Sequence, residues 1–213
     1  MHTPQDSPAA LQITLAPSAL PLFASLLQHG ILYPVSGTID LASFLLSLPG
    51  FTRDYLEQTV QTIFLDGVAA DNLDQEVGGG SVVALSAAMP GLAGAIFRRH
   101  GLHGSLRSRP VNQHQSASKS GYVTVKLFNS IATDRIKDLL AGSVLMHGPV
   151  FQTFARSRAH LFHPDVCRCV FNGAALDYPA LMATAASSPV LSIRMELRGT
   201  TLAKPGSLQL TTA

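Results

Sequence analysis

Charged residues are scarce in this sequence, and their scarcity excludes one class of protein at once. Only 13% of the 213 residues are charged, whereas 46% are hydrophobic. A chain so apolar is not disordered, and a folded core is predicted. The length suits one large domain or two small ones. The net charge of +2 is too small to indicate nucleic acid by itself.

Acidic residues are absent from Val77 to Thr133, and this gap divides the chain by charge. Eight acids and one base precede it, and six bases lie within it. An acidic front and a basic middle predict that one part docks on another, within a chain or between chains. The alternative is two solvated faces of different charge.

No secretory signal is evident at residues 1–10, which have neither a basic start nor an apolar stretch. A cytoplasmic protein is therefore expected. The uncharged run from Val77 to Phe97 is broken by several glycines and by Pro90. It predicts a strand and an apolar connector rather than a membrane span, so no membrane partner is expected.

Cysteine is nearly absent, since Cys167 and Cys169 are the only two, and His160 and His163 precede them. On a strand, residues two apart face the same side, so these four side chains are candidate zinc ligands. The C-x-C spacing is not the usual one for zinc, which favours two small buried hydrophobic residues and no metal or other cofactor. Extended backbone also disfavours a disulfide between them.

Catalytic motifs are also lacking. There is no G-x-S-x-G and no H-E-x-x-H, and the run Gly78–Ser81 lacks the lysine and helix of a phosphate-binding loop. We expect that run to be a turn. These absences favour a non-enzymatic protein, although a degenerate enzyme that uses a cleft between domains stays open.

What the sequence does contain is an internal repeat. Four segments recur in the same order with offsets of 106 to 113 residues: 11–15 with 123–127, 26–32 with 139–145, 60–71 with 166–177, and 82–88 with 190–196. Asp66-Gly67 and Asn172-Gly173 end equivalent apolar runs, and such pairs favour type I′ hairpin turns. We infer two copies of one fold, each with a central hairpin.

The first copy reads as an α+β unit, with one helix on a mixed sheet. The helix is expected to be capped by Thr38, to carry Asp40 in its first turn, and to end at Pro49-Gly50. Strands are predicted at 11–16, 31–35, 60–65 and 82–87, with a short helix or connector at 17–29. The second copy repeats this pattern with a helical stretch near 150–162.

The segment Val60 to Gly91 resembles the C-terminal half of the β-grasp sulfur carriers, such as the small subunit of molybdopterin synthase and the thiamine sulfur carrier. The resemblance implies two tandem β-grasp-like domains, at 11–97 and 122–213, after a disordered 1–10. It does not extend to function, because Pro90-Gly91 continues into further chain instead of ending in a free Gly-Gly. No functional residue of the family carries over.

Residues 98–121 are interpreted as a linker between the two domains. The segment is basic, carries glycine and serine, and contains no aromatic residue on which a nucleotide base could stack. A connector is therefore favoured over a nucleic-acid-binding segment.

The apolar connector before that linker is the predicted contact element. If exposed, it would mark a partner surface; the alternative is that it packs between the two copies. Its candidate contact residues are Met89, Pro90, Gly91, Leu92, Phe97, Arg98 and Arg99. The leading hypothesis is a non-enzymatic protein-interaction or assembly module that binds another protein or itself. The alternative is a small-ligand or metal-binding accessory protein of sulfur-carrier or molybdenum-cofactor pathways, with the histidines and cysteines above as its candidate site.

Overall fold

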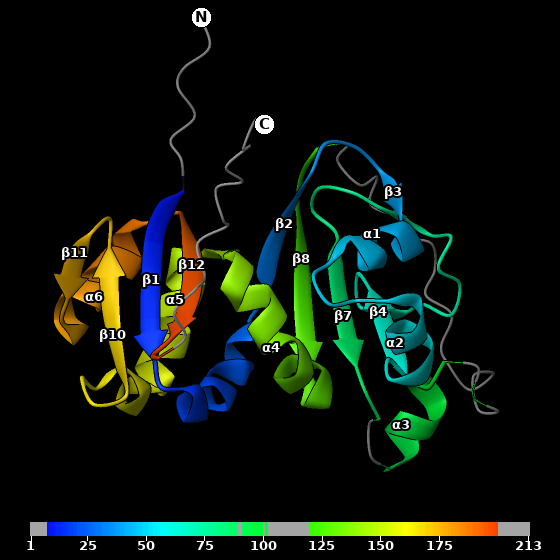
Figure 1. Ribbon diagram of the computed structural model, residues 1–213. Coiled ribbons are helices and arrows are strands. Elements are labelled where there is room, and N and C mark those ends of the chain that lie inside the picture. The colour runs from blue at the N-terminus through cyan, green and yellow to red at the C-terminus, as the bar shows by residue number, and fades with distance from the viewer. Residues whose placement is uncertain (1–7, 89–90, 100, 102–119, 200–213) are drawn as a thin grey trace, which may run out of the picture.

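Strands from both ends of the chain form one large mixed sheet. The structure is a computed structural model and describes residues 8–88, 91–99, 101 and 120–199. In this part of the chain ten strands are joined in the order β11-β10-β1-β12-β9-β2-β8-β7-β4-β5 (Figure 1). Their bounds are β1 Ala9–Leu15, β2 Ile31–Val35, β4 Thr62–Leu65, β5 Val68–Ala69, β7 Val82–Ser86, β8 Gly121–Phe128, β9 Val144–His147, β10 Cys167–Phe171, β11 Ala174–Leu176 and β12 Val190–Leu197.

A small second sheet and several helices complete the fold. The strands β3 Ile39–Asp40 and β6 Glu76–Val77 pair with each other. The helices are α1 Leu41–Ser47, α2 Arg53–Gln58, α3 Gly91–Phe97, α4 Asn129–Gly142, α5 Gly148–Ser157 and α6 Tyr178–Ser187, with 3-10 helices η1 Pro17–Gln28 and η3 Ala159–Phe162. The predicted mixed sheet packed with helices is thus confirmed.

The large sheet has two halves that meet where Leu32 of β2 pairs with Leu145 of β9. We call β9, β12, β1, β10 and β11 the β1 half, and β2, β8, β7, β4 and β5 the β2 half. Outward from the centre, each half has an antiparallel, a parallel and then two antiparallel pairings. The parallel pairs are β1 with β12 and β7 with β8.

The predicted first strands of the two copies lie in each other's half. β1 pairs with β10 and β12, which come from the second copy, whereas β8 pairs with β2 and β7 of the first copy. Two separate tandem β-grasp domains are therefore not confirmed. Residues 1–7 and most of the predicted linker 98–121 lie outside the described residues, and Ala9 and Ala10 belong to β1.

The order of elements still recurs as the repeat predicts. A strand, a helical segment and a second strand occur as β1-η1-β2 and again as β8-α4-β9. Both hairpin turns are confirmed, because their residues have positive φ: 52° and 82° at Asp66 and Gly67, 47° and 87° at Asn172 and Gly173. These are the angles of a type I′ turn, which glycine adopts without strain.

The predicted cap of α1 is wrong by two residues. Asp40, not Thr38, is the N-cap, and its carboxylate accepts a hydrogen bond of 2.8 Å from the backbone N–H of Ser43. The helix begins at Leu41, so a side chain at residue 40 reaches the free N–H groups of its first turn. The predicted apolar face is confirmed, since Leu41, Phe44, Leu45 and Leu48 are all buried.

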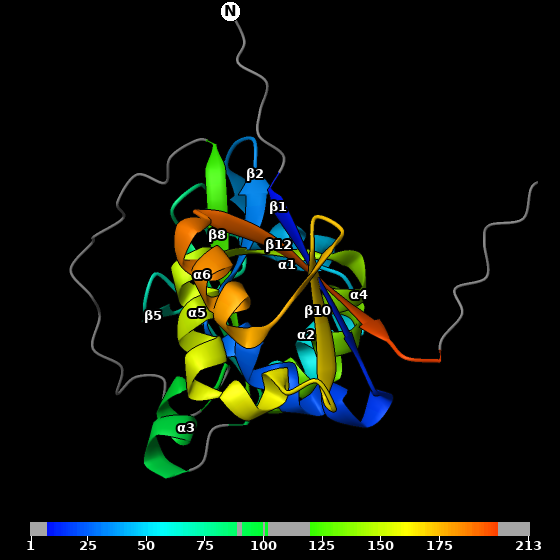
Figure 2. The ribbon, with the colours of Figure 1, turned by 90° about the vertical axis from the view of Figure 1, so that its left-hand side faces the viewer.

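Helices cover different faces of the two halves. α1, α2 and α4 lie on the near face in Figure 1, and α5 and α6 lie on the opposite face (Figure 2). One continuous core links them and includes an aromatic cluster at the β1 half. Phe23 of η1 packs there against Phe154 of α5 and Phe162 of η3, with ring centroids 6.1 and 5.7 Å apart. Within the described residues, none of the helices combines the length and hydrophobicity of a bilayer span.

Candidate functional site

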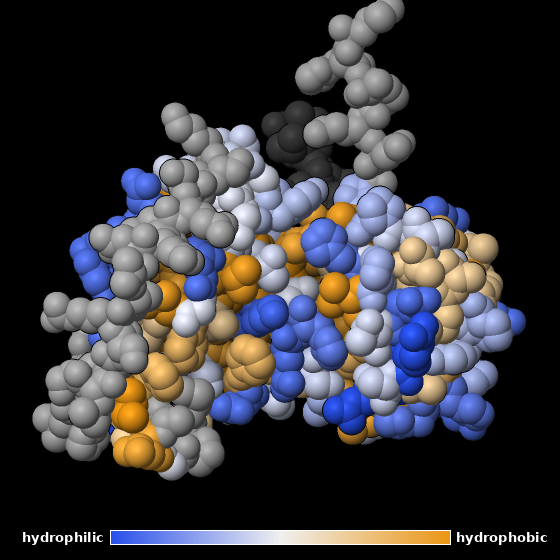
Figure 3. Space-filling view, turned by 180° about the vertical axis from the view of Figure 1, so that it is seen from behind, coloured by the Kyte–Doolittle hydropathy of each residue, from blue (hydrophilic) through white to orange (hydrophobic). Residues whose placement is uncertain are grey.

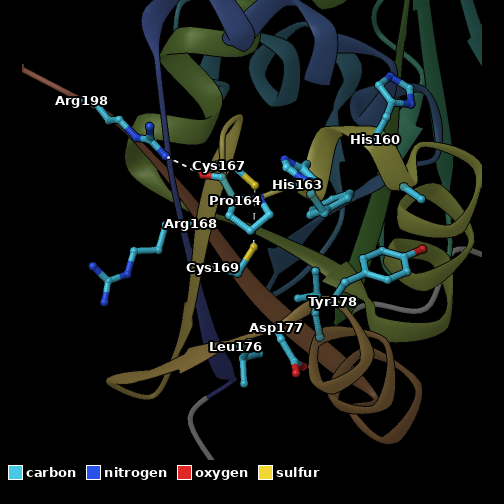
Figure 4. A pocket seen from close by; sticks show the side chains of 13 residues that line it. His160, His163, Pro164, Cys167, Arg168, Cys169, Leu176, Asp177, Tyr178 and Arg198 are labelled. Carbon is cyan, nitrogen blue, oxygen red and sulfur yellow. Dashed lines mark hydrogen bonds between the residues drawn. The ribbon is translucent and has the colours of Figure 1, made fainter.

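A pocket in the β1 half brings together the histidines and cysteines that the sequence singles out. It has a volume of about 560 Å³ and lies between β10, η3, the start of α6 and the residue after β12. Its lining is Ala159, His160, Phe162, His163, Pro164, Cys167, Arg168, Cys169, Leu176, Asp177, Tyr178, Leu181 and Arg198 (Figure 4).

The two cysteines form a close pair of free thiols. Cys167 and Cys169 are both buried and face the same side of β10, with sulfur atoms 4.0 Å apart (Figure 4). The strand is held on both sides, since Cys167 and Cys169 pair with β1 and Cys169 also pairs with Leu176 of β11. The alternation of a strand thus places both thiols together, as the C-x-C spacing predicts.

The two thiols have unequal acidities. The contact with the Cys169 thiol lowers the pKa of Cys167, and Arg198 acts in the same direction, while burial opposes them. The pKa of Cys169 is raised, first because its proton is engaged in this contact and then because it is buried.

The four candidate zinc ligands do not come together around one ion. His160 and His163 are exposed at the mouth of the pocket. His163 is engaged elsewhere, because its Nδ1 lies 3.2 Å from the carboxylate of Asp165. No three histidine, cysteine or acidic side chains of the described residues are placed to share one ion.

Basic groups outnumber acidic ones around the pocket. Arg168, Arg198 and the two histidines line it, and Asp177 is the sole acid in its lining. The carboxylate of Asp177 caps α6 by accepting a 2.8 Å hydrogen bond from the N–H of Ala180. Arg198 donates to the carbonyl of Pro164 at 3.4 Å, whereas the side chain of Arg168 points away from the sulfurs (Figure 4). A ligand here would meet a positive rim.

The predicted contact element forms α3 and the turn after it. Met89 and Pro90 lie outside the described residues, and Gly91, Leu92 and Phe97 belong to α3. Leu92 is 70% exposed. Phe97 is half-buried and lies against Phe64 of β4, with centroids 5.3 Å apart. The element is therefore attached to the β2 half and still presents a large apolar side chain to solvent.

Arg98 and Arg99 follow α3, and Arg99 serves as its anchor. Its guanidinium donates to the carbonyl of Leu56 at 3.2 Å, and its backbone N–H donates to Gln61 at 2.7 Å. Burial lowers the pKa of Arg99, although the negative charges of Asp71 and Glu57 oppose this shift. The acidic front and the basic middle of the chain thus meet here within one molecule.

The outward sheet face beside α3 is unusually apolar. In the β2 half, Phe64, Val82, Ala84 and Phe128 are only partly buried on this face, with Thr124 and Lys126 among them. The corresponding face of the β1 half is more polar: Val170, Leu145 and Ala10 share it with Gln12, Thr14, Arg168, Ser192, Arg194 and Glu196. Figure 3 shows hydrophobic residues on the rear of the molecule around α3, at its lower left. We call Phe64, Val82, Ala84, Lys126 and Phe128, with Leu92 and Phe97, the α3 face.

The glycine run 78–80 is a turn between β6 and β7, as predicted. The N–H of Gly78 donates to the hydroxyl of Ser81 at 3.3 Å, and the N–H of Gly80 donates to the carbonyl of Tyr122 at 2.9 Å. Two of its amides therefore have partners within the protein and are not aimed at an anion.

Sequence reasoning named only the two histidines and the two cysteines of the pocket, and among the polar lining residues that it missed are Asp177, Tyr178 and Arg198. Asp177-Tyr178-Pro179 carries the cap-and-proline signature of a helix start, and this signal could have revealed α6. Nothing comparable marks Arg198, which reaches the pocket because β12 lies two strands from β10. No protein-family model, curated protein or solved structure matches this chain.

Proposed function

We propose that this protein is a non-enzymatic assembly module that binds a second copy of itself through the α3 face. The contrast between the two halves of the sheet supports the proposal. A solvated sheet face is normally mostly polar, as in the β1 half, whereas contiguous exposed apolar residues are typical of interaction surfaces. Leu92 at 70% exposure is suited to be the anchor of such a surface.

Charge supports a second copy as the occupant. Arg98 lies at the α3 end of β4, since the next residue bonds to Gln61, and Asp66 lies at the other end of the same strand. A two-fold axis that lies in the plane of the interface, perpendicular to β4, would bring Arg98 of one copy toward Asp66 of its partner. Such self-complementarity is what a two-fold interface requires.

Sedimentation velocity over a range of concentrations tests the proposal. The wild-type protein should sediment as a dimer, and Leu92→Glu should sediment as a monomer. Leu22→Glu is the matched control, because Leu22 is also exposed, at 55%, but lies on η1; it should remain dimeric. A monomeric wild type, or a Leu92→Glu variant that stays dimeric, would contradict the proposal. A monomer that instead copurifies with a different protein would also reject self-association.

Within this proposal each half is a β-grasp-like unit that has received its first strand from the other copy. The recurrence of β1-η1-β2 as β8-α4-β9 supports this interpretation. Because of this exchange the two copies fold as one unit, since each half of the sheet would lose an inner strand if the copies separated.

A second candidate function is binding of a small ligand or metal ion, as an accessory protein in the cytoplasm. The pocket of about 560 Å³ with its buried thiols and basic rim favours it, and the cytoplasm keeps such thiols reduced. Native mass spectrometry of the protein purified from its host should then show a defined extra mass. That mass should disappear in the Cys167→Ser, Cys169→Ser double variant. A wild-type spectrum without any extra mass, or the same extra mass in the wild type and the double variant, would reject this candidate.

A further inference from the structure

We propose that Cys167 and Cys169 together bind one Cu(I) ion as a pair of thiolates. This inference deepens the second candidate function by naming the ligand of the pocket. It starts from the 4.0 Å separation of the two sulfurs, from their place in the wall of the pocket, and from their being the two cysteines of the chain.

The separation suits a metal ion between the sulfurs without movement of the backbone. With metal–sulfur bonds of about 2.3 Å, sulfurs 4.0 Å apart subtend an angle of about 120° at the ion. That angle is the one preferred by a three-coordinate ion. A disulfide would require the sulfurs to close to about 2.05 Å, against the pairing of both residues with β1.

The number of protein ligands selects the ion. Zinc sites use four ligands, or three with an open position, and iron–sulfur clusters use four. The described residues supply no third histidine, cysteine or acid in position. Soft thiolates select Cu(I) among the remaining ions, and Cu(I) is satisfied by two or three soft ligands.

Charge and protons balance at this site. Cu(I) replaces the two thiol protons, so two protons are released and the bound unit carries a net charge of −1. Arg198 lines the pocket and acts electrostatically on Cys167, and this cation offsets that charge. A small thiolate from solution would supply the third ligand of a trigonal set.

An anaerobic titration of the reduced full-length protein with Cu(I), in competition with the chelator bicinchoninate, tests the proposal. We expect one ion retained per chain, two protons released per ion, and sulfur neighbours at about 2.3 Å in the X-ray absorption spectrum. Cys167→Ala and Cys169→Ala should each lose the ion to the chelator. His163→Ala is the matched control, and it should retain the ion because His163 pairs with Asp165.

Three outcomes would overturn the proposal: no retention by the wild-type protein, retention by the double cysteine variant, or loss of the ion in His163→Ala. If a cysteine variant fails to fold, alkylation of the wild-type protein replaces it, since bound Cu(I) should slow the reaction of both thiols with iodoacetamide. If the protein does not retain Cu(I) but its native spectrum shows a different extra mass, the copper proposal is rejected and the second candidate function is kept. Failure with no extra mass would reject the second candidate function as well.

Discussion

Asn172 and Ala10, which lie 162 residues apart in the sequence, exchange two hydrogen bonds. The side-chain oxygen of Asn172 accepts a hydrogen bond of 3.3 Å from the backbone N–H of Ala10. The backbone N–H of Asn172 donates to the carbonyl of Ala10 at 3.1 Å. Asp66 makes the equivalent pair with Val82, at 2.7 and 2.8 Å. Each hairpin turn thus holds the start of a neighbouring strand, and the second hairpin holds a strand from the first copy.

The exchange predicts that the two halves of the chain fold only together. Fragments 1–101 and 102–213 should each lack a cooperative unfolding transition, because each is without an inner strand of its sheet. Mixing them should restore the circular dichroism spectrum of the intact protein. Cooperative unfolding of either fragment by itself would show that the copies are independent.

Phe23 tests the same exchange through packing. It belongs to the first copy but is fully buried against rings of the second. Phe23→Ala should lower the free energy of unfolding by about 3–5 kcal/mol, because it leaves a cavity in the core. Leu22→Ala is the control at the exposed neighbouring position and should change it by less than about 0.5 kcal/mol. Equal effects in urea unfolding would place Phe23 outside the core.

Asp40 should make the stability of the protein depend on pH. Hydrogen bonds from Ser43 hold the pKa of Asp40 below its ordinary value. The charged form therefore favours folding: the contribution is present above the unfolded-state pKa and is lost as the pH falls through the lower folded-state pKa. The difference in unfolding free energy between wild type and Asp40→Ala should shrink as the solution is acidified.

Thr52 provides the matched control for this pH dependence. It caps α2 with a neutral hydroxyl, which accepts from the N–H of Tyr55 at 3.2 Å. Thr52→Ala should cost about 1 kcal/mol at every pH, because no charge is involved. A constant difference for Asp40→Ala over the acidic range would contradict the assigned role of its charge.

Arg99 should control self-association without controlling the fold. Arg99→Met keeps much of the aliphatic stem but removes the donors that reach Leu56 and Val60. We expect α3 to detach from the sheet, so that the dimer dissociates at concentrations where wild type remains associated, with the melting temperature of the monomer little changed. An Arg99→Met dimer as stable as the wild-type dimer would show that the attachment of α3 to the sheet does not matter for the interface.

Local structure was predictable because short-range chemistry determines it. Residues 31–35 form a strand with the predicted bounds, and both hairpins turn where Asp-Gly and Asn-Gly require it. α4 was not predicted, because its polar and apolar residues give no clear amphipathic pattern beyond Ile131, Ile136, Leu139 and Leu140. α6 was missed because its alanines and threonine blur the buried stripe formed by Leu181 and Ala185.

The exchange of first strands could not be read from the sequence. Leu11, Ile13 and Leu15 alternate as a strand whichever sheet they join, and their burial is satisfied equally by either half. The proximity of the two thiols followed from their spacing, whereas the arrival of Arg198 depends on the pairing order of distant strands. Tertiary pairing, rather than any local signal, sets the pocket and the α3 face.

Native mass spectrometry of the untagged protein, purified gently from its own host, tests the central claim most directly. The account predicts an ion series at twice the mass of the 22.5 kDa chain, which changes to the single-chain mass in Leu92→Glu. A wild-type spectrum that contains only the single chain over the full concentration range would contradict assembly through the α3 face.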